Sequence, residues 1–334
     1  MSYYAPRFRD TAINFFDTPR SHFFISDCIV DFRTGLIYKD GEIHWETANE
    51  HVAWEPHWIT VDVRWANRIT RQALIADRMS QIKQYFDEKI RNTQNIPSHI
   101  DGTALHLLHP FGHYVYGHFY DTLQKLSTIE KEKLHFDSLL LSRQQGIVDF
   151  ETHLQAIGLT NHPRIPNNSG LVRIKRLLCV MPVSHPATFT TESYEYCRKK
   201  YYQYFGVRND VTPNLKIFLT RRPGFRRILL NNDEIEKTLK NAGIVFMDGT
   251  ENLETIVKYF SKASHIAGVH GALFMNNIFG HETTKYLEYC PRSRPVLAFK
   301  NQTKLCGNYE HVLIDDVSHD ISLDVEEILK FYVS

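Results

Sequence analysis

The chain has 334 residues, few cysteines and no pattern among them. The five cysteines are widely scattered, odd in number and without a C-x-x-C pair. This argues against both a disulfide framework and a zinc site, and it fits a reducing compartment. No segment approaches the roughly 18 uninterrupted apolar residues of a transmembrane helix, and the N-terminus lacks an apolar core of signal-peptide length. We therefore expect a soluble, cytoplasmic protein with its cysteines buried as small hydrophobic residues.

An excess of charge of one sign is also missing. The 39 basic and 38 acidic residues give a formal net charge of +1, so no basic field recruits nucleic acid or an anionic membrane. Any anion must be bound by a local site. The length, with 43% hydrophobic and 13% aromatic residues, is enough to fill two domain cores.

Three nucleotide-binding signatures are absent as well. The first strand expected in the second half has no G-x-G-x-x-G loop after it, which disfavours a nicotinamide or flavin cofactor, and no G-x-x-x-x-G-K-[ST] loop is present. No D-x-D triplet occurs, which weakens a metal-chelating diphosphate site. We therefore expect neither a cofactor nor a metal.

The first part of the chain has a mixed pattern. Apolar and polar residues alternate on both sides of Asp40-Gly41, which predicts a hairpin because a type I′ turn needs positive φ at both central positions. A turn-rich segment at 206–214 marks the expected boundary between domains 1–206 and 207–334. The other elements expected before it are helices at 66–91, 117–126, 149–159 and 193–204 and strands at 104–108, 137–142 and 176–183.

The second part alternates regularly between strands and helices. This alternation predicts a parallel, doubly wound α/β sheet, because parallel neighbours need a crossover that is usually helical. The final amphipathic segment, 322–333, can pack on either domain. The strands are expected at 216–220, 244–247, 265–269 and 285–289.

An elbow at His270-Gly271 ends the third of these strands. Such an elbow presents backbone N–H groups and a helix N-terminus at the carboxyl edge of a sheet, where phosphates bind. The alternative is that Gly271 only allows close packing and that His270 is a solvated loop residue. Arginine suits bidentate phosphate contacts, and four arginines follow the first strand of the same sheet: Arg221, Arg222, Arg226 and Arg227. Their alternative is a solvated basic turn.

Two further places carry candidate site residues. Glu288 ends the fourth strand, where a carboxylate can accept ribose hydroxyls, or can simply face solvent. His118 and Asp121 lie three residues apart at the start of an expected helix, so they share a face and form a candidate acid/base pair. The nearby His109 and His113 are conceivable metal ligands, but no pair of histidines with H-x-x-x-H spacing lies inside a recognisable helix with a third ligand.

Four segments together resemble family-61 glycosyltransferases. The segment "YGHFYDTLQKL" is similar to that family's Gly-His-aromatic segment with Asp three residues after the His, and "LTRRPGFRRILLNNDEI" to its Ser-Arg, Arg-Arg-Ile, Asn-Glu block. The segment "IAGVHGALFMNNIF" resembles its Gly-x-His-Gly-Ala-Gly-Leu-x-Asn motif, and "YLEYCP" its following strand. The four segments occur in the family's order over roughly 104–299.

The resemblance implies a GT-B-like arrangement of two Rossmann-like α/β domains facing across a cleft, and inversion at the anomeric carbon. A UDP-sugar, xylose or N-acetylglucosamine first, then passes to a glycan hydroxyl by metal-independent displacement, with Asp121 or His118 as base. A catalytically silent nucleotide-sugar or glycan-binding module on the same fold is the alternative. The residues expected to hold the nucleotide sugar are Arg221, Arg226, Arg227, His270, Gly271, Ala272, Asn276 and Glu288.

Overall fold

The structure is a computed structural model that describes most of the chain between residues 21 and 334. The described residues fall into two compact units. The first takes in those up to 141 and between 161 and 180, and the second takes in 149–160 and those from 190 onward. The described ranges are 21–32, 34–44, 68–99, 102–108, 122–141, 149–166, 170–180, 190–208, 212–221, 228–293, 299 and 307–334.

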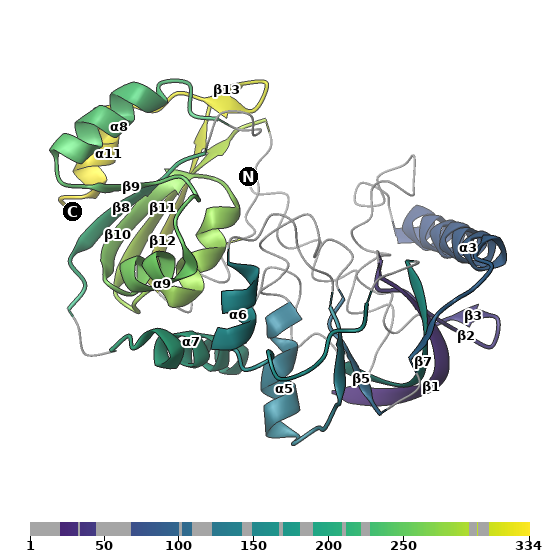
Figure 1. Ribbon diagram of the computed structural model, residues 1–334. Helices are drawn as coiled ribbons and strands as arrows, with labels where there is room; N and C mark the ends of the chain where they lie inside the picture. Colours follow the sequence, from purple (N-terminus) through teal and green to yellow (C-terminus); the bar gives the residue numbers. More distant parts are fainter. Residues whose placement is uncertain are drawn as a thin grey trace. The chain divides into compact units, whose positions relative to one another are not determined.

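The first unit contains a mixed sheet (Figure 1). Its order is β3-β2-β1-β7-β5-β6, with β4 also paired to β7. Strand β1 is antiparallel to β2 and β7, whereas β4 and β5 run parallel to β7, and β6 runs parallel to β5. The strands are β1 (His22–Asp31), β2 (Ile37–Lys39), β3 (Glu42–Ile43), β4 (Ser98–His99), β5 (Ala104–His106), β6 (Ser138–Leu140) and β7 (Leu171–Val180).

The predicted hairpin is confirmed. Strands β2 and β3 pair antiparallel on either side of Asp40 and Gly41, whose φ angles are 52° and 86°. Helix α3 (Arg68–Asn92) matches the long helix predicted nearby. Helix α5 (Lys125–Lys131) overlaps the last two residues of the helix predicted at 117–126, and residues 117–121 of that prediction lie outside the described residues.

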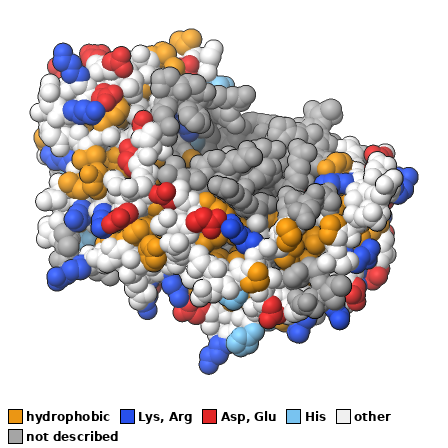
Figure 2. All heavy atoms as spheres, in the orientation of Figure 1, with side chains coloured by type: hydrophobic (Ala, Val, Ile, Leu, Met, Phe, Trp, Pro, Cys, Tyr) orange, Lys and Arg blue, Asp and Glu red, His pale blue; other side chains and the backbone are white. Residues whose placement is uncertain are grey.

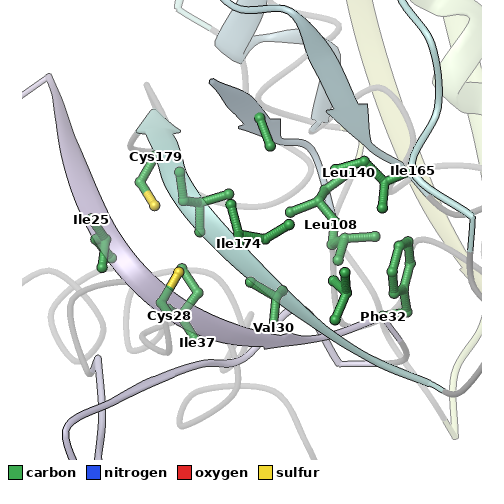
Figure 3. Packing of buried hydrophobic residues seen from close by; sticks show 13 residues of the cluster. Ile25, Cys28, Val30, Phe32, Ile37, Leu108, Leu140, Ile165, Ile174 and Cys179 are labelled. Carbon is green, nitrogen blue, oxygen red and sulfur yellow. The ribbon is translucent and has the colours of Figure 1, made fainter. Parts of the chain in front are cut away.

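The core of the first unit lies along β1 and β7 (Figure 3). Alternate side chains of the two strands, such as Val30 and Ile174, point into it. The described cysteines Cys28, Cys179, Cys197 and Cys290 are buried, as predicted. Burial raises the pKa of Cys28 and of Cys197 to about 12, so both thiols stay protonated at neutral pH and act as small apolar residues.

The second unit contains a five-stranded sheet in which every pair of neighbours is parallel. Four strands were predicted, and β12 is an addition. In the order β12-β11-β10-β8-β9, the central strand β10 lies next to β8, so the first and third strands of this unit in the sequence are neighbours. The strands are β8 (Leu215–Leu219), β9 (Val245–Met247), β10 (Ala263–Val269), β11 (Thr284–Pro291) and β12 (Gly307–Ile314).

Six helices of the second unit are described, together with a small hairpin of β13 (Asp316–Val317) and β14 (Asp320–Ile321). The side chain of Asn252 accepts a hydrogen bond from the Thr255 amide and so caps α9. The helices are α6 (Phe150–Ala156), α7 (Thr191–Phe205), α8 (Asn232–Asn241), α9 (Leu253–Ser261), the 3₁₀ helix η3 (Ala272–Phe279) and α11 (Val325–Phe331).

The C-terminal segment packs on the second unit. Ile328 of α11 and the following Tyr332 join the core formed by β8, β10 and α8, and α11 contacts α8 (Figure 1). The Tyr332 hydroxyl donates a 2.6 Å hydrogen bond to the carbonyl oxygen of Ile217. Of the two positions expected for this helix, the structure shows the one on the second unit.

The predicted α/β class is confirmed, whereas the GT-B arrangement of two Rossmann-like domains stays a prediction. Within the described ranges, no helix combines the length and apolar character required to cross a bilayer. Basic and acidic side chains are interspersed over the described surface on the face drawn in Figure 2, as the balanced composition leads one to expect.

Candidate functional site

The candidate site lies where β8 and β10 end side by side. If the strands are numbered along the chain with β8 as strand 1, their order across the sheet is 2-1-3-4-5. Connections therefore leave β8 and β10 in opposite directions, which makes this pair the topological switch point of the sheet. Ligands of open α/β sheets bind outside the carboxyl ends of the strands at such a point. Arg221 follows β8 and His270 follows β10 at this edge.

Arg221 lies directly against Gly271. A Cβ atom at position 271 would be 2.5 Å from Nη2 and 2.7 Å from Nε of the Arg221 guanidinium. The φ angle of Gly271 is −178°, an extended conformation that any residue adopts. The absence of a side chain at position 271 therefore leaves room for the guanidinium, which occupies the volume that a side chain would fill. The structure thus brings together two of the predicted site residues.

A second glycine brings the two strands close together beneath this contact. Gly268 pairs with Leu219 across β10 and β8, and a Cβ at position 268 would lie 2.3 Å from the Leu219 carbonyl oxygen. That oxygen belongs to the backbone and cannot swing aside. Gly268 therefore fixes the spacing of the strands from which Arg221 and His270 emerge.

His270 is buried and held by two hydrogen bonds. Its backbone N–H donates to the carbonyl oxygen of Tyr289 at 2.8 Å, and its Nδ1 lies 2.5 Å from Oε1 of Glu288. The ring also packs against Phe299, at 5.3 Å between ring centroids. Because the His270 N–H is used in the sheet, the predicted backbone donors to a phosphate reduce to the N–H groups of Gly271 and Ala272, at the start of η3.

Glu288 is fully buried on β11. Its Oε1 faces His270, and its Oε2 accepts a hydrogen bond from the Tyr309 hydroxyl on β12. Burial, and then the nearby Glu288 carboxylate, raise the pKa of Tyr309 far above its ordinary value, so the phenol remains protonated and donates. The contact from Glu288 to a ribose stays a prediction.

Helix η3 carries the other two site residues of this segment. Ala272 is its first residue and is partly exposed. Asn276 is fully buried, and its Nδ2 donates a 3.1 Å hydrogen bond to the carbonyl oxygen of Leu273. This bond satisfies a carbonyl inside a 3₁₀ helix, so in the structure the amide supports the turn that follows Gly271.

Helix α7 anchors η3, a relationship that the sequence reasoning missed. The hydroxyls of Tyr194 and Tyr202 donate to the carbonyl oxygens of Asn277 and Phe279 at 2.9 and 2.7 Å. Between them, Arg198 donates to the carbonyl oxygen of Gly280 at 3.3 Å. The three side chains are four residues apart and share one helix face. These contacts explain why α7, expected in the first domain, belongs to the second compact unit.

Several predicted residues lie outside the described residues: Arg222, Arg226 and Arg227 of the arginine cluster, and the candidate acid/base pair His118 and Asp121. Their contacts stay predictions. Two residues around His270 were not predicted, Tyr309 and Phe299. The signal available for Tyr309 was the aromatic and β-branched content of "GNYEHVLI", which suits a strand although apolar and polar residues do not alternate strictly in it.

The fold and the site define a doubly wound α/β protein with a basic side chain and a helix N-terminus at the switch point of its parallel sheet. Residues 111–287, more than half of the chain, match the family Glycosyltransferase 61. The chain therefore belongs to this family and is a glycosyltransferase, which implies a sugar donor and an acceptor as substrates. No curated protein shows a significant match to the chain.

Proposed function

We propose that the protein is an inverting glycosyltransferase that moves a sugar from a UDP-sugar to a hydroxyl of a glycan acceptor. The family supports the transferase class. The observation that carries the choice of site is the packing of the Arg221 guanidinium on Gly271 at the switch point. A cation held against bare backbone at this edge suits a diphosphate.

The leaving group is stabilised by fixed donors in this proposal. Negative charge grows on the nucleoside diphosphate as the glycosidic bond breaks, so donors placed there in advance lower the barrier. Arg221, Arg226 and Arg227 supply cationic donors, and the N–H groups of Gly271 and Ala272 supply neutral ones. These donors take the place of a divalent metal, since the chain has no D-x-D triplet.

A carboxylate completes the mechanism as general base. Asp121 removes the proton of the acceptor hydroxyl, the oxygen attacks the anomeric carbon, and the diphosphate leaves from the opposite face. His118 is the alternative base, since it lies three residues away on the same predicted helix. The family resemblance favours xylose or N-acetylglucosamine as the sugar, and we place the reaction in the cytoplasm.

The test is release of UDP from UDP-xylose and UDP-N-acetylglucosamine, measured with and without glycan acceptors and with and without EDTA. We expect slow hydrolysis of one donor alone, faster release with an acceptor hydroxyl, and most of this activity to remain in EDTA. Loss of activity in EDTA with recovery on adding Mn²⁺ would contradict the metal-independent mechanism. Tight UDP binding without any release would favour the catalytically silent module.

A further inference from the structure

The chain of side chains behind His270 runs across three neighbouring strands. His270 follows β10, Glu288 lies on β11 and Tyr309 lies on β12. Glu288 pairs with His311, two residues beyond Tyr309, so the side chains of Glu288 and Tyr309 are on one face of the sheet. Each carboxylate oxygen of Glu288 has its own partner, Nδ1 of His270 on one side and the Tyr309 hydroxyl on the other.

A carboxylate in this position has no simple structural reason to be there. Glu288 has no exposed surface, and removing a charge from water costs several kcal/mol unless it is paired and hydrogen-bonded. An apolar residue would pack in the same place without that cost. The buried charge and its two hydrogen bonds therefore suggest that Glu288 serves the histidine beside it.

The hydrogen bonds fix which ring nitrogen of His270 carries a proton. The Tyr309 phenol donates to Oε2, and a carboxylate only accepts, so the short contact at Oε1 requires a proton on Nδ1 of His270. Packing against Phe299 opposes a flip of the ring. Nε2 is then the nitrogen available for a ligand at this edge.

We propose that Glu288 and Tyr309 are positioning residues that hold His270 as a doubly protonated imidazolium when the donor diphosphate is bound, with Nε2–H donating to a phosphate oxygen. Phosphate oxygens only accept, so Nε2 must carry a proton in that contact, and Nδ1 already carries one. Glu288 is the counter-ion of the resulting cation, and Tyr309 keeps it oriented. This inference rests on the proposed function, because it needs a diphosphate at the site.

The decisive experiment combines UDP affinity with a direct view of the imidazole. We would measure the Kd of UDP by calorimetry for the wild type, Tyr309→Phe, His270→Gln and the double variant. We expect Tyr309→Phe to weaken UDP binding about tenfold in the wild type, as loss of an interaction with a charged group implies. In the His270→Gln background, Tyr309→Phe should have almost no effect on UDP affinity, because in the proposal Tyr309 acts on the ligand through His270. Equal effects in the two backgrounds would overturn the proposal.

The second readout is the ¹⁵N chemical shifts of the His270 ring, assigned by loss of the signal in His270→Gln. Without ligand, Nδ1 should show the shift of a protonated nitrogen, and Tyr309→Phe should move it. With UDP, both ring nitrogens should show protonated shifts. An Nδ1 signal that Tyr309→Phe leaves unchanged contradicts the positioning role, even if no UDP binds. Failure of the wild type to bind UDP while Nδ1 responds to the variant contradicts the proposed function instead.

Two further variants separate positioning from folding. Tyr332→Phe removes another buried hydroxyl of this unit, one that bonds to the Ile217 carbonyl and not to Glu288. It should lower the Tm yet leave UDP affinity and the His270 signal unchanged. If Tyr309→Phe does not fold, Glu288→Gln takes its place, since the amide retains an acceptor for His270 and a donor for Tyr309 while the charge is lost. We expect it too to weaken UDP binding about tenfold, and an unchanged affinity would refute the counter-ion role.

Discussion

Substituting alanine for Gly271 should impair the glycosyltransferase without unfolding it. The new Cβ would lie 2.5 Å from Nη2 and 3.0 Å from Cζ of Arg221, whereas unstrained heavy atoms lie about 3.5–4.0 Å apart. The guanidinium must therefore move by about 1 Å. The guanidinium is the end of a long, flexible and partly exposed side chain, so moving it costs less than moving a backbone atom. The extended φ of Gly271 suits alanine as well.

The expected loss is in donor chemistry. A displacement of about 1 Å in a positioning group lowers reaction rates by about 10²-fold, and a weakened charge-assisted contact lowers UDP affinity by about tenfold or more. We would measure UDP release from the donor, the Kd of UDP and the thermal midpoint of the Gly271→Ala variant. Wild-type turnover in this variant would refute the view that Arg221 acts from its position against Gly271.

Gly268→Ala is the matched control, because it places the same methyl group three residues earlier, on β10. Its Cβ would lie 2.3 Å from the Leu219 carbonyl oxygen, which belongs to a paired backbone and cannot swing aside. Overpacking of this kind costs about 3 kcal/mol or more, or roughly 6–12 °C in Tm for a unit of this size. The two substitutions should therefore have different effects. Gly268→Ala unfolds at a lower temperature, whereas Gly271→Ala retains its fold and loses activity.

Three further predictions concern the proposed leaving-group donor, the proposed base and a buried histidine. Arg221→Ala should cost about 2–4 kcal/mol of transition-state stabilisation, read as a fall in kcat/KM for the donor, and unchanged turnover would exclude Arg221 from the leaving-group site. Asp121→Asn should bind UDP normally while transfer falls by roughly 10²–10⁴-fold, with a milder effect for His118→Ala; the reverse pattern would exchange the two roles. Burial lowers the pKa of His153 to about 3 from its ordinary 6.5, so the folded state excludes the proton that the unfolded chain accepts below pH 6.5. The contribution of His153 to the free energy of unfolding is therefore full above pH 6.5 and is lost as the pH decreases, by about 2 kcal/mol between pH 7 and pH 5. Denaturant unfolding at the two pH values should show this loss in the wild type and a smaller one in His153→Gln, and equal losses in both would show that other groups are responsible.

Local patterns in the sequence were sufficient for much of the fold. Asp40-Gly41 specifies its hairpin through the φ angles that the turn demands, and the alternation of strands and helices after residue 215 specifies the parallel sheet. The strand-to-helix elbow at His270 could be placed from the end of an apolar run. In each case the deciding interaction lies within a few residues of the signal.

The relationships that were missed depend on residues far apart in the chain. Glu288 meets Tyr309 only because β11 and β12 pair in one register. The alternation of apolar and polar residues in "GNYEHVLI" is too weak to predict a fifth strand or the strand beside which it lies. The bonds from α7 to η3 span about 80 residues. The sequence also indicated only part of the reason for a glycine at position 271. It suggested close approach of a ligand, and the structure shows in addition that the Arg221 guanidinium occupies the space that a side chain at 271 would fill.

The central claim is that a nucleoside diphosphate binds at the carboxyl edge between β8 and β10. Hydrogen–deuterium exchange of the wild type, measured with and without saturating UDP, tests it most directly because it reports the site peptide by peptide. We predict that UDP slows exchange in peptides that cover the end of β8 through Arg221 and the start of η3 from Gly271, and that Arg221→Ala loses this protection. Protection confined to peptides of the first unit, or UDP binding that leaves both segments unchanged, would contradict the site.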